Sequence, residues 1–318
     1  MNSSGKIAAI VNPRARGGLA GKRWPRIAAA LERRLGPVDA RFTDAPGGGI
    51  RIARQLLEEG AELIIAVGGD GTVNEAANGF LESDAAVRTR ARLGILPLGT
   101  GGDLRRTLGI PARLEDAIEI LASGVPVAID AGKIVFSGVR GKRAQRYFVN
   151  LVSFGMGGEV ASRASRAPRF LGGRAAFFLA TLGTFFGYRG KTIRLRLDGA
   201  LEDFGRKALN IAVGNGRFHG GGMHPCPRAL VNDGLLDVTF IEFMGWFELA
   251  RDVHYLYSDD VYRHPKTRFF RARTVSAESD DPVSIEVDGE PLGELPAEIT
   301  VVPASLRVMV ARDSKLRP

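Results

Sequence analysis

Cysteine is almost absent from this sequence, since its 318 residues include only Cys226. One cysteine excludes an intramolecular disulfide and fits a reducing compartment. The N-terminal residues lack a signal-peptide pattern, and the uncharged stretch 175–187 is shorter than the ~20 residues that cross a bilayer. We therefore expect a cytoplasmic protein without a membrane-spanning helix.

Metal-ligand and nucleic-acid motifs are also missing. The four histidines, at positions 219, 224, 254 and 264, lack spacings such as His-Glu-x-x-His. No helix-turn-helix, zinc module or aromatic RNA-binding motif occurs. The net charge of +9 narrows the partners to anionic ones, namely a nucleotide, a nucleic acid or a membrane surface. Without such a motif, we expect no nucleic-acid partner.

The length suits two domains, and the first 125 residues alternate strand and helix patterns at short spacing. Strands are predicted at Lys6–Asn12, Val38–Thr43, Ala61–Val67 and Leu93–Leu98. Helices are predicted at Gly21–Leu35, Gly48–Glu59, Thr72–Leu81 and Arg113–Ser123. This order predicts a doubly wound parallel sheet, a Rossmann-like nucleotide domain whose ligands bind beyond the carboxyl ends of the strands.

Residues 126–302 follow a different pattern, in which segments of strand length succeed one another. These segments lie near 127–136, 146–153, 191–198, 207–214, 235–242, 268–277, 283–288 and 298–310. Asp-Gly or Asn-Gly turns follow several of them, at 198–199, 215–216, 233–234 and 288–289. We expect an antiparallel β-sandwich domain here, with the tail at about 303–318 packing back on the first domain.

One short segment, Val67-Gly68-Gly69-Asp70-Gly71-Thr72-Val73-Asn74-Glu75, joins a buried strand pattern to a helix pattern. Its glycines permit a tight turn and a close approach to a ligand, and N–H groups at a helix start bind phosphate. A carboxylate in such a turn repels phosphate unless a cation lies between them, so Asp70 indicates a nucleotide with Mg²⁺. Thr72 and Glu75 also fit a capping box, which an ordinary structural turn would share.

Polar residues and glycines follow the other predicted strands as well. Asn12 ends the first strand, Thr43 ends the second, and Gly99 and Thr100 follow the fourth. Because the carboxyl ends of parallel strands meet at one edge of a sheet, we expect these residues and Gly68–Thr72 to surround one crevice. Asn12 is suited to bind phosphate and Thr100 to supply a hydroxyl, although Asn12-Pro13 is equally explained as a simple strand exit.

Further segments accompany the glycine turn along nearly the whole chain: Ile10–Gly18, Leu96–Arg105, Leu230–Val238 and Val287–Pro291. Together they resemble the diacylglycerol kinase catalytic family, in particular its soluble bacterial lipid kinases, which are similar to sphingosine and ceramide kinases. The resemblance implies ATP, Mg²⁺ and the same two-domain plan. It implies an ATP site formed by Asn12, Pro13, Arg14, Thr43, Gly68, Gly69, Asp70, Gly71, Thr72, Asn74, Glu75, Gly99 and Thr100.

The resemblance also implies a catalytic set of Glu290, Asp288 and Asp70. Glu290 corresponds to the proton acceptor of the family and Asp288 to its close partner. The chemistry agrees, because a carboxylate between the domains is suited to orient and deprotonate a lipid hydroxyl. A plain Asp-Gly hairpin turn explains the same residues without any catalysis.

A second, structural Mg²⁺ is implied at Leu230, Asp233 and Leu235, through one carboxylate and two backbone carbonyls. Ligation by oxygen alone suits a hard cation. A loop with a turn-forming Asn-Asp-Gly sequence is an equally good explanation. Two residues depart from the family pattern, since Gly102 replaces an Asn that is able to bind substrate and Arg16 replaces a Ser.

Arginines flank the uncharged stretch 175–187, at 163, 166, 169 and 174 before it and at 189 after it, where Lys191 follows. The stretch is either a buried helix that packs on the β domain, or a helix at an acyl pocket or the membrane interface. In the second case, Phe177, Phe178, Phe185 and Phe186 insert beside cations that contact anionic phospholipid.

These features predict an ATP- and Mg²⁺-dependent lipid kinase that associates peripherally with the membrane. Its acceptor is a diacylglycerol-like lipid, a sphingoid base or ceramide, or phosphatidylglycerol. The alternatives are a kinase of a soluble acceptor, such as an NAD kinase, and a non-catalytic nucleotide or lipid sensor. A homodimer is left open.

Overall fold

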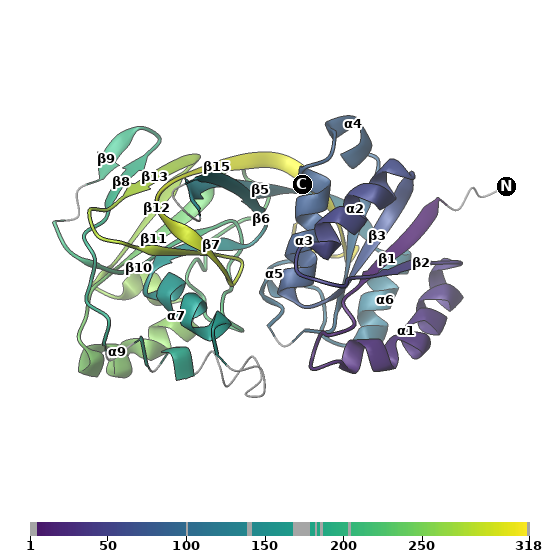
Figure 1. The fold of residues 1–318 in the computed structure, drawn as a ribbon, viewed down its shortest axis with the longest axis horizontal. Helices are drawn as coiled ribbons and strands as arrows, with labels where there is room; N and C mark the ends of the chain where they lie inside the picture. The colour runs from purple at the N-terminus through teal and green to yellow at the C-terminus, as the bar shows by residue number, and fades with distance from the viewer. Residues whose placement is uncertain are drawn as a thin grey trace. The chain divides into compact units, whose positions relative to one another are not determined.

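The computed structural model describes residues 5–99, 101–138, 142–167, 179–181, 183–184, 187–202 and 205–316. The chain forms two compact units (Figure 1). Unit 1 comprises Met1–Ala131 and Pro303–Pro318, and unit 2 comprises Gly132–Val302. Two strands, β5 (Val125–Ser137) and β15 (Glu290–Val310), carry the chain across this division.

Unit 1 is built on a parallel sheet whose strands have the order β4-β3-β1-β2. The strands are β1 (Lys6–Val11), β2 (Asp39–Phe42), β3 (Ala61–Gly68) and β4 (Arg92–Pro97). The helices are α1 (Leu19–Leu35), α2 (Gly48–Glu58), α3 (Asp70–Leu81), α4 (Ala85–Arg88), α5 (Asp103–Thr107) and α6 (Leu114–Ser123). The end of β15 pairs in parallel with β4, through Val308 and Leu93.

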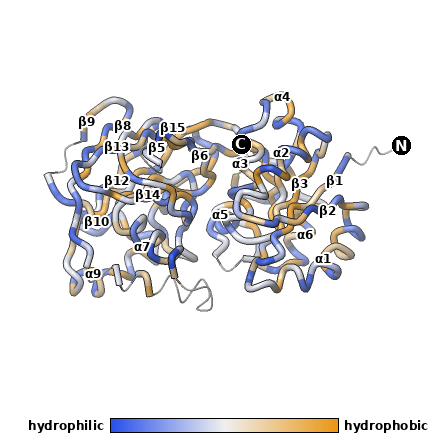
Figure 2. Tube along the Cα trace, in the orientation of Figure 1, coloured by the Kyte–Doolittle hydropathy of each residue, from blue (hydrophilic) through white to orange (hydrophobic). Residues whose placement is uncertain are grey.

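The predicted doubly wound sheet is confirmed. The burial of its strands explains why the apolar sequence pattern predicted them. Residues 8–11 of β1 and 63–67 of β3 are apolar and buried, as expected for parallel strands covered on both faces, and Figure 2 shows the hydropathy of these strands. The four predicted helices correspond to α1, α2, α3 and α6. The short helices α4 and α5 escaped prediction because four or five residues show no clear helical periodicity.

The predicted capping box of Thr72 and Glu75 is wrong. Helix α3 begins at Asp70, its N-cap residue is Gly69, and no side chain caps it. The Glu75 carboxylate instead accepts hydrogen bonds from the N–H groups of Gly47 and Gly49, both at 2.7 Å. Glu75 therefore caps the first turn of the neighbouring helix α2, a contact between helices that a local sequence rule does not reveal.

Unit 2 is mainly antiparallel. The main path of strands is β12-β11-β10-β7-β14-β15, with β13 and β5 also pairing with β15. The strands are β6 (Arg143–Phe148), β7 (Leu151–Gly155), β8 (Arg194–Leu197), β9 (Ala200–Glu202), β10 (Ala208–Gly214), β11 (Leu236–Glu242), β12 (Thr267–Ala272), β13 (Thr274–Glu278) and β14 (Ser284–Val287). The helical segments are α7 (Met156–Ser165), α9 (Trp246–Asp252), η3 (Val253–Tyr257) and η4 (Val261–Arg263).

One apolar core joins the strands of unit 2, with Phe148, Phe154 and Phe240 among its largest buried side chains. Two of the predicted turns, at 198–199 and 288–289, connect the strands of the hairpins β8–β9 and β14–β15. In each turn the aspartate, Asp198 or Asp288, adopts a positive φ and is followed by a glycine. The predicted antiparallel sandwich is thus confirmed.

The arginine-flanked stretch is described only in part. Arg169, Arg174 and the four phenylalanines of that hypothesis lie outside the described residues. Arg163 lies on α7 and forms an ion pair with Glu159 at 2.7 Å. Among the described residues, no helix combines the length and the apolar character needed to cross a membrane.

The cap by Glu75 leads to a stability prediction. We expect Glu75→Ala to lower the free energy of unfolding by about 2 kcal/mol, because two N–H groups of α2 lose a charged acceptor. Denaturant unfolding measures this change. Glu58→Ala, at an exposed position on α2, is the matched control and should stay within about 0.5 kcal/mol of the wild type. Equal values for the two variants would contradict the capping role.

Candidate functional site

Asn12 joins the end of β1 to the glycine turn. Its N–H group donates a hydrogen bond to the carbonyl of Val67 at 3.1 Å. Its side-chain oxygen accepts one from the N–H group of Arg14 at 3.0 Å, and its amide nitrogen donates to the Thr72 hydroxyl at 3.3 Å. The first motif and the start of α3 therefore meet at the carboxyl edge of the sheet, as predicted. Thr43 adjoins them, because its N–H group donates to the carbonyl of Val11.

The glycine turn after β3 lies directly against the loop after β4. A Cβ atom on Gly99 would lie 2.4 Å from the Cα atom of Gly69, so neither loop has room for a side chain there. A Cβ atom on Gly68 would lie 2.3 Å from the Thr72 hydroxyl. The glycines are thus required by the close approach of two backbones. Thr100 lies outside the described residues.

Asp70 binds the loop after β4 rather than standing free in the turn. Its two carboxylate oxygens accept hydrogen bonds from the N–H groups of Gly102 at 2.6 Å and Asp103 at 2.9 Å. These N–H groups begin helix α5, whose N-cap residue is Gly102. A Cβ atom on Gly101 would lie 2.4 Å from the same carboxylate. Asp70 therefore caps α5 and sets the shape of this loop.

Asp103 and Arg105 also lie in this loop, although the sequence did not lead us to assign them to the site. Asp103 is 7% exposed, and its carboxylate accepts from Arg106 at 2.7 Å. The side chain of Arg105 lies against Gly102, and burial lowers the pKa of Arg105 while Asp70 and Asp103 oppose that effect. In the sequence, their position within the motif Leu96–Arg105 indicates that they belong to the site.

The carboxylates of Asp70 and Asp103 bear on the question of Mg²⁺. No group of three or more His, Cys, Asp or Glu in the described part of the chain could hold a metal by itself. Mg²⁺ is commonly held by one or two carboxylates together with substrate phosphates. The pair of carboxylates beside the glycine turn fits that type of nucleotide-dependent site.

Gly102 has a φ of +75°, a left-handed conformation that glycine and asparagine both tolerate. The departure from Asn at this position therefore preserves the backbone shape. Arg16 also has a positive φ, of +54°, and begins a left-handed run through Gly17 and Gly18.

Two of the predicted ATP-binding residues, Asn74 and Glu75, also make structural contacts. Asn74 is buried, and its side-chain oxygen accepts a hydrogen bond from Asn78 at 3.1 Å. Glu75 caps α2, as described above. The assignment of Asn74 and Glu75 to the ATP site stays a prediction beside these structural contacts.

In unit 2, Asp288 and Glu290 lie on the β14–β15 hairpin with different environments. The Asp288 carboxylate accepts hydrogen bonds from three successive N–H groups, those of Val149 and Asn150 at 3.2 Å and Leu151 at 2.7 Å. Glu290 is about half exposed and forms an ion pair with Arg146 at 3.7 Å. Asp288 thus fixes the hairpin against the β6–β7 turn, while Glu290 keeps a solvent-accessible carboxylate.

A buried polar cluster lies behind this hairpin and was not foreseen. Glu286 is fully buried, and one of its oxygens contacts His219 at 2.7 Å and accepts from the Ser153 hydroxyl at 2.8 Å. Glu286 lies in β14, two residues before Asp288 in the turn that follows the strand. No local pattern in the sequence indicated this cluster, because its three residues are far apart along the chain.

At the predicted second metal site, both oxygens of the Asp233 carboxylate have partners. One oxygen of Asp233 accepts the N–H group of Leu235 at 3.0 Å, and the other binds the guanidinium of Arg271. Arg271 also contacts Asp237 at 3.2 Å, while burial raises the pKa of Asp237 to about 6. Leu230 is half exposed nearby in sequence. The guanidinium of Arg271 contacts Asp233 in this structure, and the assignment of Leu230, Asp233 and Leu235 to a second Mg²⁺ stays a prediction.

Comparison with known proteins places both units in described families. Residues 6–134 match the diacylglycerol kinase catalytic domain. Residues 150–310 match the YegS C-terminal NAD kinase beta sandwich-like domain. The two matches divide the chain much as its compact units do.

Full-length relatives agree with these matches. A diacylglycerol kinase of Mycobacterium tuberculosis is 32% identical over 313 residues, covering 97% of this chain and 96% of the relative. A YegS-like lipid kinase of Chromohalobacter salexigens is 29% identical over 280 residues, covering 87% and 85%. A crystal structure of a diacylglycerol kinase from Bacillus anthracis has the same fold, with a TM-score of 0.71, 21% identity and 96% coverage of each chain.

The cap on α5 can be tested by amide hydrogen exchange. We expect Asp70→Asn to speed exchange at Gly102 and Asp103 by roughly tenfold or more, because an amide accepts through one oxygen and turns its NH₂ group toward the second donor. Asp116→Asn, at an exposed position on α6, is the matched control and should leave that loop unchanged. If Gly102 and Asp103 exchange as slowly in the Asp70 variant as in the wild type, the Asp70 carboxylate does not fix the conformation of this loop.

Proposed function

The chain belongs to the diacylglycerol kinase family of ATP-dependent lipid kinases, and we propose that it phosphorylates the hydroxyl of a diacylglycerol-like membrane lipid. Unit 1 is the nucleotide-binding domain in this proposal, and unit 2 is the lipid-binding domain. The observation that carries it is the organisation of the glycine turn and α5 around Asp70, in a chain whose relatives are named lipid kinases.

In unit 1, the N–H groups of the turn Gly68–Thr72 bind the ATP phosphates at the start of α3. Asn12 and Thr72 hold the adjoining loops in place through their shared hydrogen bond. Asp70 and Asp103 would hold Mg²⁺ together with phosphate oxygens. When bound, the ion neutralises charge that develops on the transferred phosphoryl group. Positioning is the main contribution of these residues, because phosphoryl transfer has a loose transition state.

In unit 2, Glu290 orients the acceptor hydroxyl and takes its proton. Asp288 is a positioning residue, since its carboxylate is fully engaged with three N–H groups. Arg146 lies beside Glu290 and forms an ion pair with that carboxylate.

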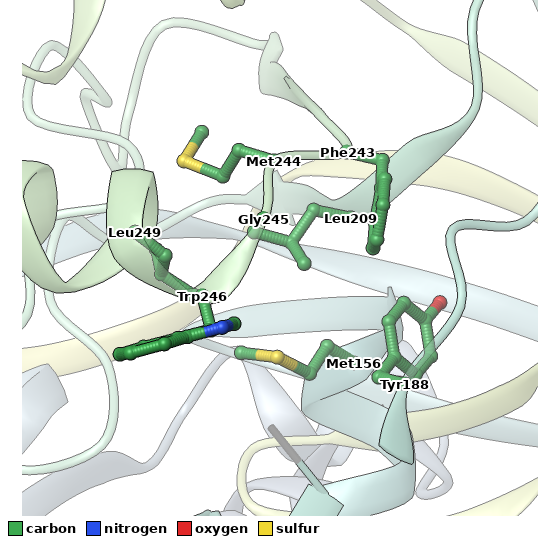
Figure 3. Close-up of a pocket in the computed structure, with 8 residues that line it drawn as sticks. All are labelled: Met156, Tyr188, Leu209, Phe243, Met244, Gly245, Trp246 and Leu249. Atoms are coloured by element: carbon green, nitrogen blue, oxygen red, sulfur yellow. The ribbon is translucent and has the colours of Figure 1, made fainter. Parts of the chain in front are cut away.

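An apolar pocket in unit 2 supports a lipid acceptor. It has a volume of about 200 Å³ and is lined mainly by Met156, Tyr188, Leu209, Phe243, Trp246 and Leu249. Figure 3 shows these side chains around the pocket: Met156 from α7, Leu209 from β10, Trp246 and Leu249 from α9, and Tyr188 and Phe243 from the connecting segments. Part of an acyl chain fits against these apolar and aromatic side chains.

Tyr188 adds a polar group to this lining. Its side chain is 9% exposed, and its hydroxyl has no hydrogen-bond partner among the described residues. Burial raises the pKa of the Tyr188 phenol, so the group stays protonated and able to donate. An ester or hydroxyl oxygen of a bound lipid is a suitable acceptor for it.

The proposal is tested by incubating the protein with labelled ATP, Mg²⁺ and a panel of lipids. We expect phosphorylation of diacylglycerol in mixed micelles above that of a sphingoid base, ceramide, phosphatidylglycerol and NAD. A preference for a sphingoid base or ceramide would select the alternative lipid acceptor. Phosphorylation of NAD alone, or of none of them, would overturn the proposal in favour of a soluble acceptor or a sensor.

Substitutions of the two hairpin carboxylates, Asp288 and Glu290, should have different effects. We expect Glu290→Gln to lower kcat by roughly 10²–10⁴ with little change in thermal stability, because a general base is lost while a half-exposed side chain keeps its size and shape. Asp288→Asn should instead lower the melting temperature as well as the rate, since three N–H groups lose a charged acceptor. Steady-state kinetics with thermal unfolding measures both. A Glu290 variant of wild-type kcat would exclude it as the base.

Filling the pocket should impair long-chain acceptors selectively. We expect Met156→Trp to raise KM for a long-chain diacylglycerol at least fivefold, while KM for a short-chain analogue changes little, because only the long chain needs the pocket. Leu201→Trp, on the exposed hairpin β8–β9, is the matched control. Equal changes for both chain lengths would place the acyl chain elsewhere.

A further inference from the structure

Large exposed hydrophobic side chains gather on one short segment of unit 2. Eight such residues occur among the described parts of the chain, and four of them lie within residues 246–257. Trp246 and Phe247, at the start of α9, are 49% and 71% exposed, and their rings lie against each other. Val253 and Tyr257 follow in η3. An exposed tryptophan–phenylalanine pair is costly in water unless another surface covers it.

The exposed pair is continuous with the apolar pocket. Trp246 both lines the pocket and keeps half of its surface in solvent, whereas Phe247 does not line it (Figure 3). An acyl chain that moves from a bilayer beside α9 into the pocket would therefore contact apolar side chains throughout.

Three cations adjoin this segment without ion pairs in the described part of the chain: Arg189, Lys191 and Lys207. Lys207 is beside the pocket, because its carbonyl accepts from the N–H group of Phe243 at 2.7 Å. The intervening Gly190 lies against both Phe243 and Lys207. Arg189 and Lys207 are exposed, and Lys191 is partly so.

The acidic side chains nearby are neutralised by other partners. Glu248 contacts Lys266 at 2.6 Å, Asp252 contacts Arg251 at 2.7 Å, and Glu242 contacts Arg206 at 3.4 Å. The segment 246–257 with the three cations, called the α9 edge, thus combines aromatic side chains with a positive charge that has no internal counterion.

We propose that the α9 edge is the surface that docks this protein on an anionic phospholipid bilayer, an inference that rests on its proposed action on a membrane lipid. Trp and Phe insert at the level of the headgroups, where a tryptophan ring finds both apolar and polar neighbours. The three cations face anionic headgroups, and the pocket opens beside the inserted rings.

A second copy of the chain is the other occupant to consider, and the charges disfavour it. A twofold dimer places the same patch on both sides of the interface. Arg189, Lys191 and Lys207 of one copy would then approach the same cations of the other, in a protein of net charge +9. An anionic bilayer satisfies the cations and the aromatic pair together.

The docking surface is tested with the full chain and sucrose-loaded vesicles of equal parts phosphatidylcholine and phosphatidylglycerol. Phe247→Ser should weaken binding about tenfold, because its ring no longer leaves water. Combined Arg189→Gln, Lys191→Gln and Lys207→Gln should weaken it roughly a hundredfold at low salt and flatten its salt dependence. The matched controls are Leu201→Ser and, on α1, combined Lys22→Gln, Arg23→Gln and Arg26→Gln, which should bind as the wild type does.

Fluorescence locates the contact directly. The chain has two tryptophans, so Trp24→Phe leaves Trp246 as the sole reporter. Its emission should shift to the blue on anionic vesicles, with quenching by brominated lipid, and should not change on pure phosphatidylcholine. Unchanged emission, or vesicle binding indifferent to Phe247→Ser and to the triple variant, would overturn the proposal. Conversion of a dimer to a monomer by these variants would identify the edge as an interface between copies.

Activity measurements separate this proposal from the proposed function. Phe247→Ser and the triple cation variant should phosphorylate a short-chain diacylglycerol in solution at the wild-type rate, yet lose activity on vesicles in proportion to their binding. A protein that binds vesicles through the edge but phosphorylates no lipid would contradict the proposed function alone. A kinase that acts on vesicles without the edge would contradict the docking surface alone.

Discussion

The Asp70 carboxylate accepts the N–H groups of Gly102 and Asp103, and the candidate nucleotide site depends on that contact. Helix α5 has only five residues, too few to be stable alone, and its first N–H groups need an acceptor. With Asp70 in that role, the loop after β4 lies against the glycine turn, and Asp103 and Arg105 are brought beside it. A residue expected only to attract a cation therefore also builds the site.

Unit 2 uses the same kind of contact for a different purpose. The Asp288 carboxylate accepts three backbone N–H groups and fixes the β14–β15 hairpin. Glu290, two residues further along the chain, is about half exposed and forms an ion pair with Arg146. Backbone N–H groups are abundant and rigid donors, so a carboxylate that binds several of them holds a loop more firmly than a pair of flexible side chains. One acid positions while its neighbour remains available for chemistry.

Unit 2, the proposed lipid-binding unit, combines a pocket lined by apolar side chains with cations that lack ion-pair partners in the described structure. Most acidic groups around α9 already have cationic partners, whereas Arg189, Lys191 and Lys207 lack them in the described structure. The aromatic pair at the start of α9 borders the same pocket. A substrate that resides in a bilayer requires both features, since the protein must approach an anionic surface and then accept an apolar chain.

The sequence by itself determined the elements whose signal is local. Buried apolar strands, amphipathic helices and Asp-Gly turns follow from residue periodicity, and the meeting of Asn12, the glycine turn and Gly99 follows from parallel topology. Only the tertiary structure decided the partners of the carboxylates. Glu75 caps α2 instead of its own helix, Asp233 binds Arg271, and Glu286 binds His219. These contacts join residues between 26 and 67 positions apart, and a hydrogen bond depends on where two groups lie in space, which no local pattern encodes.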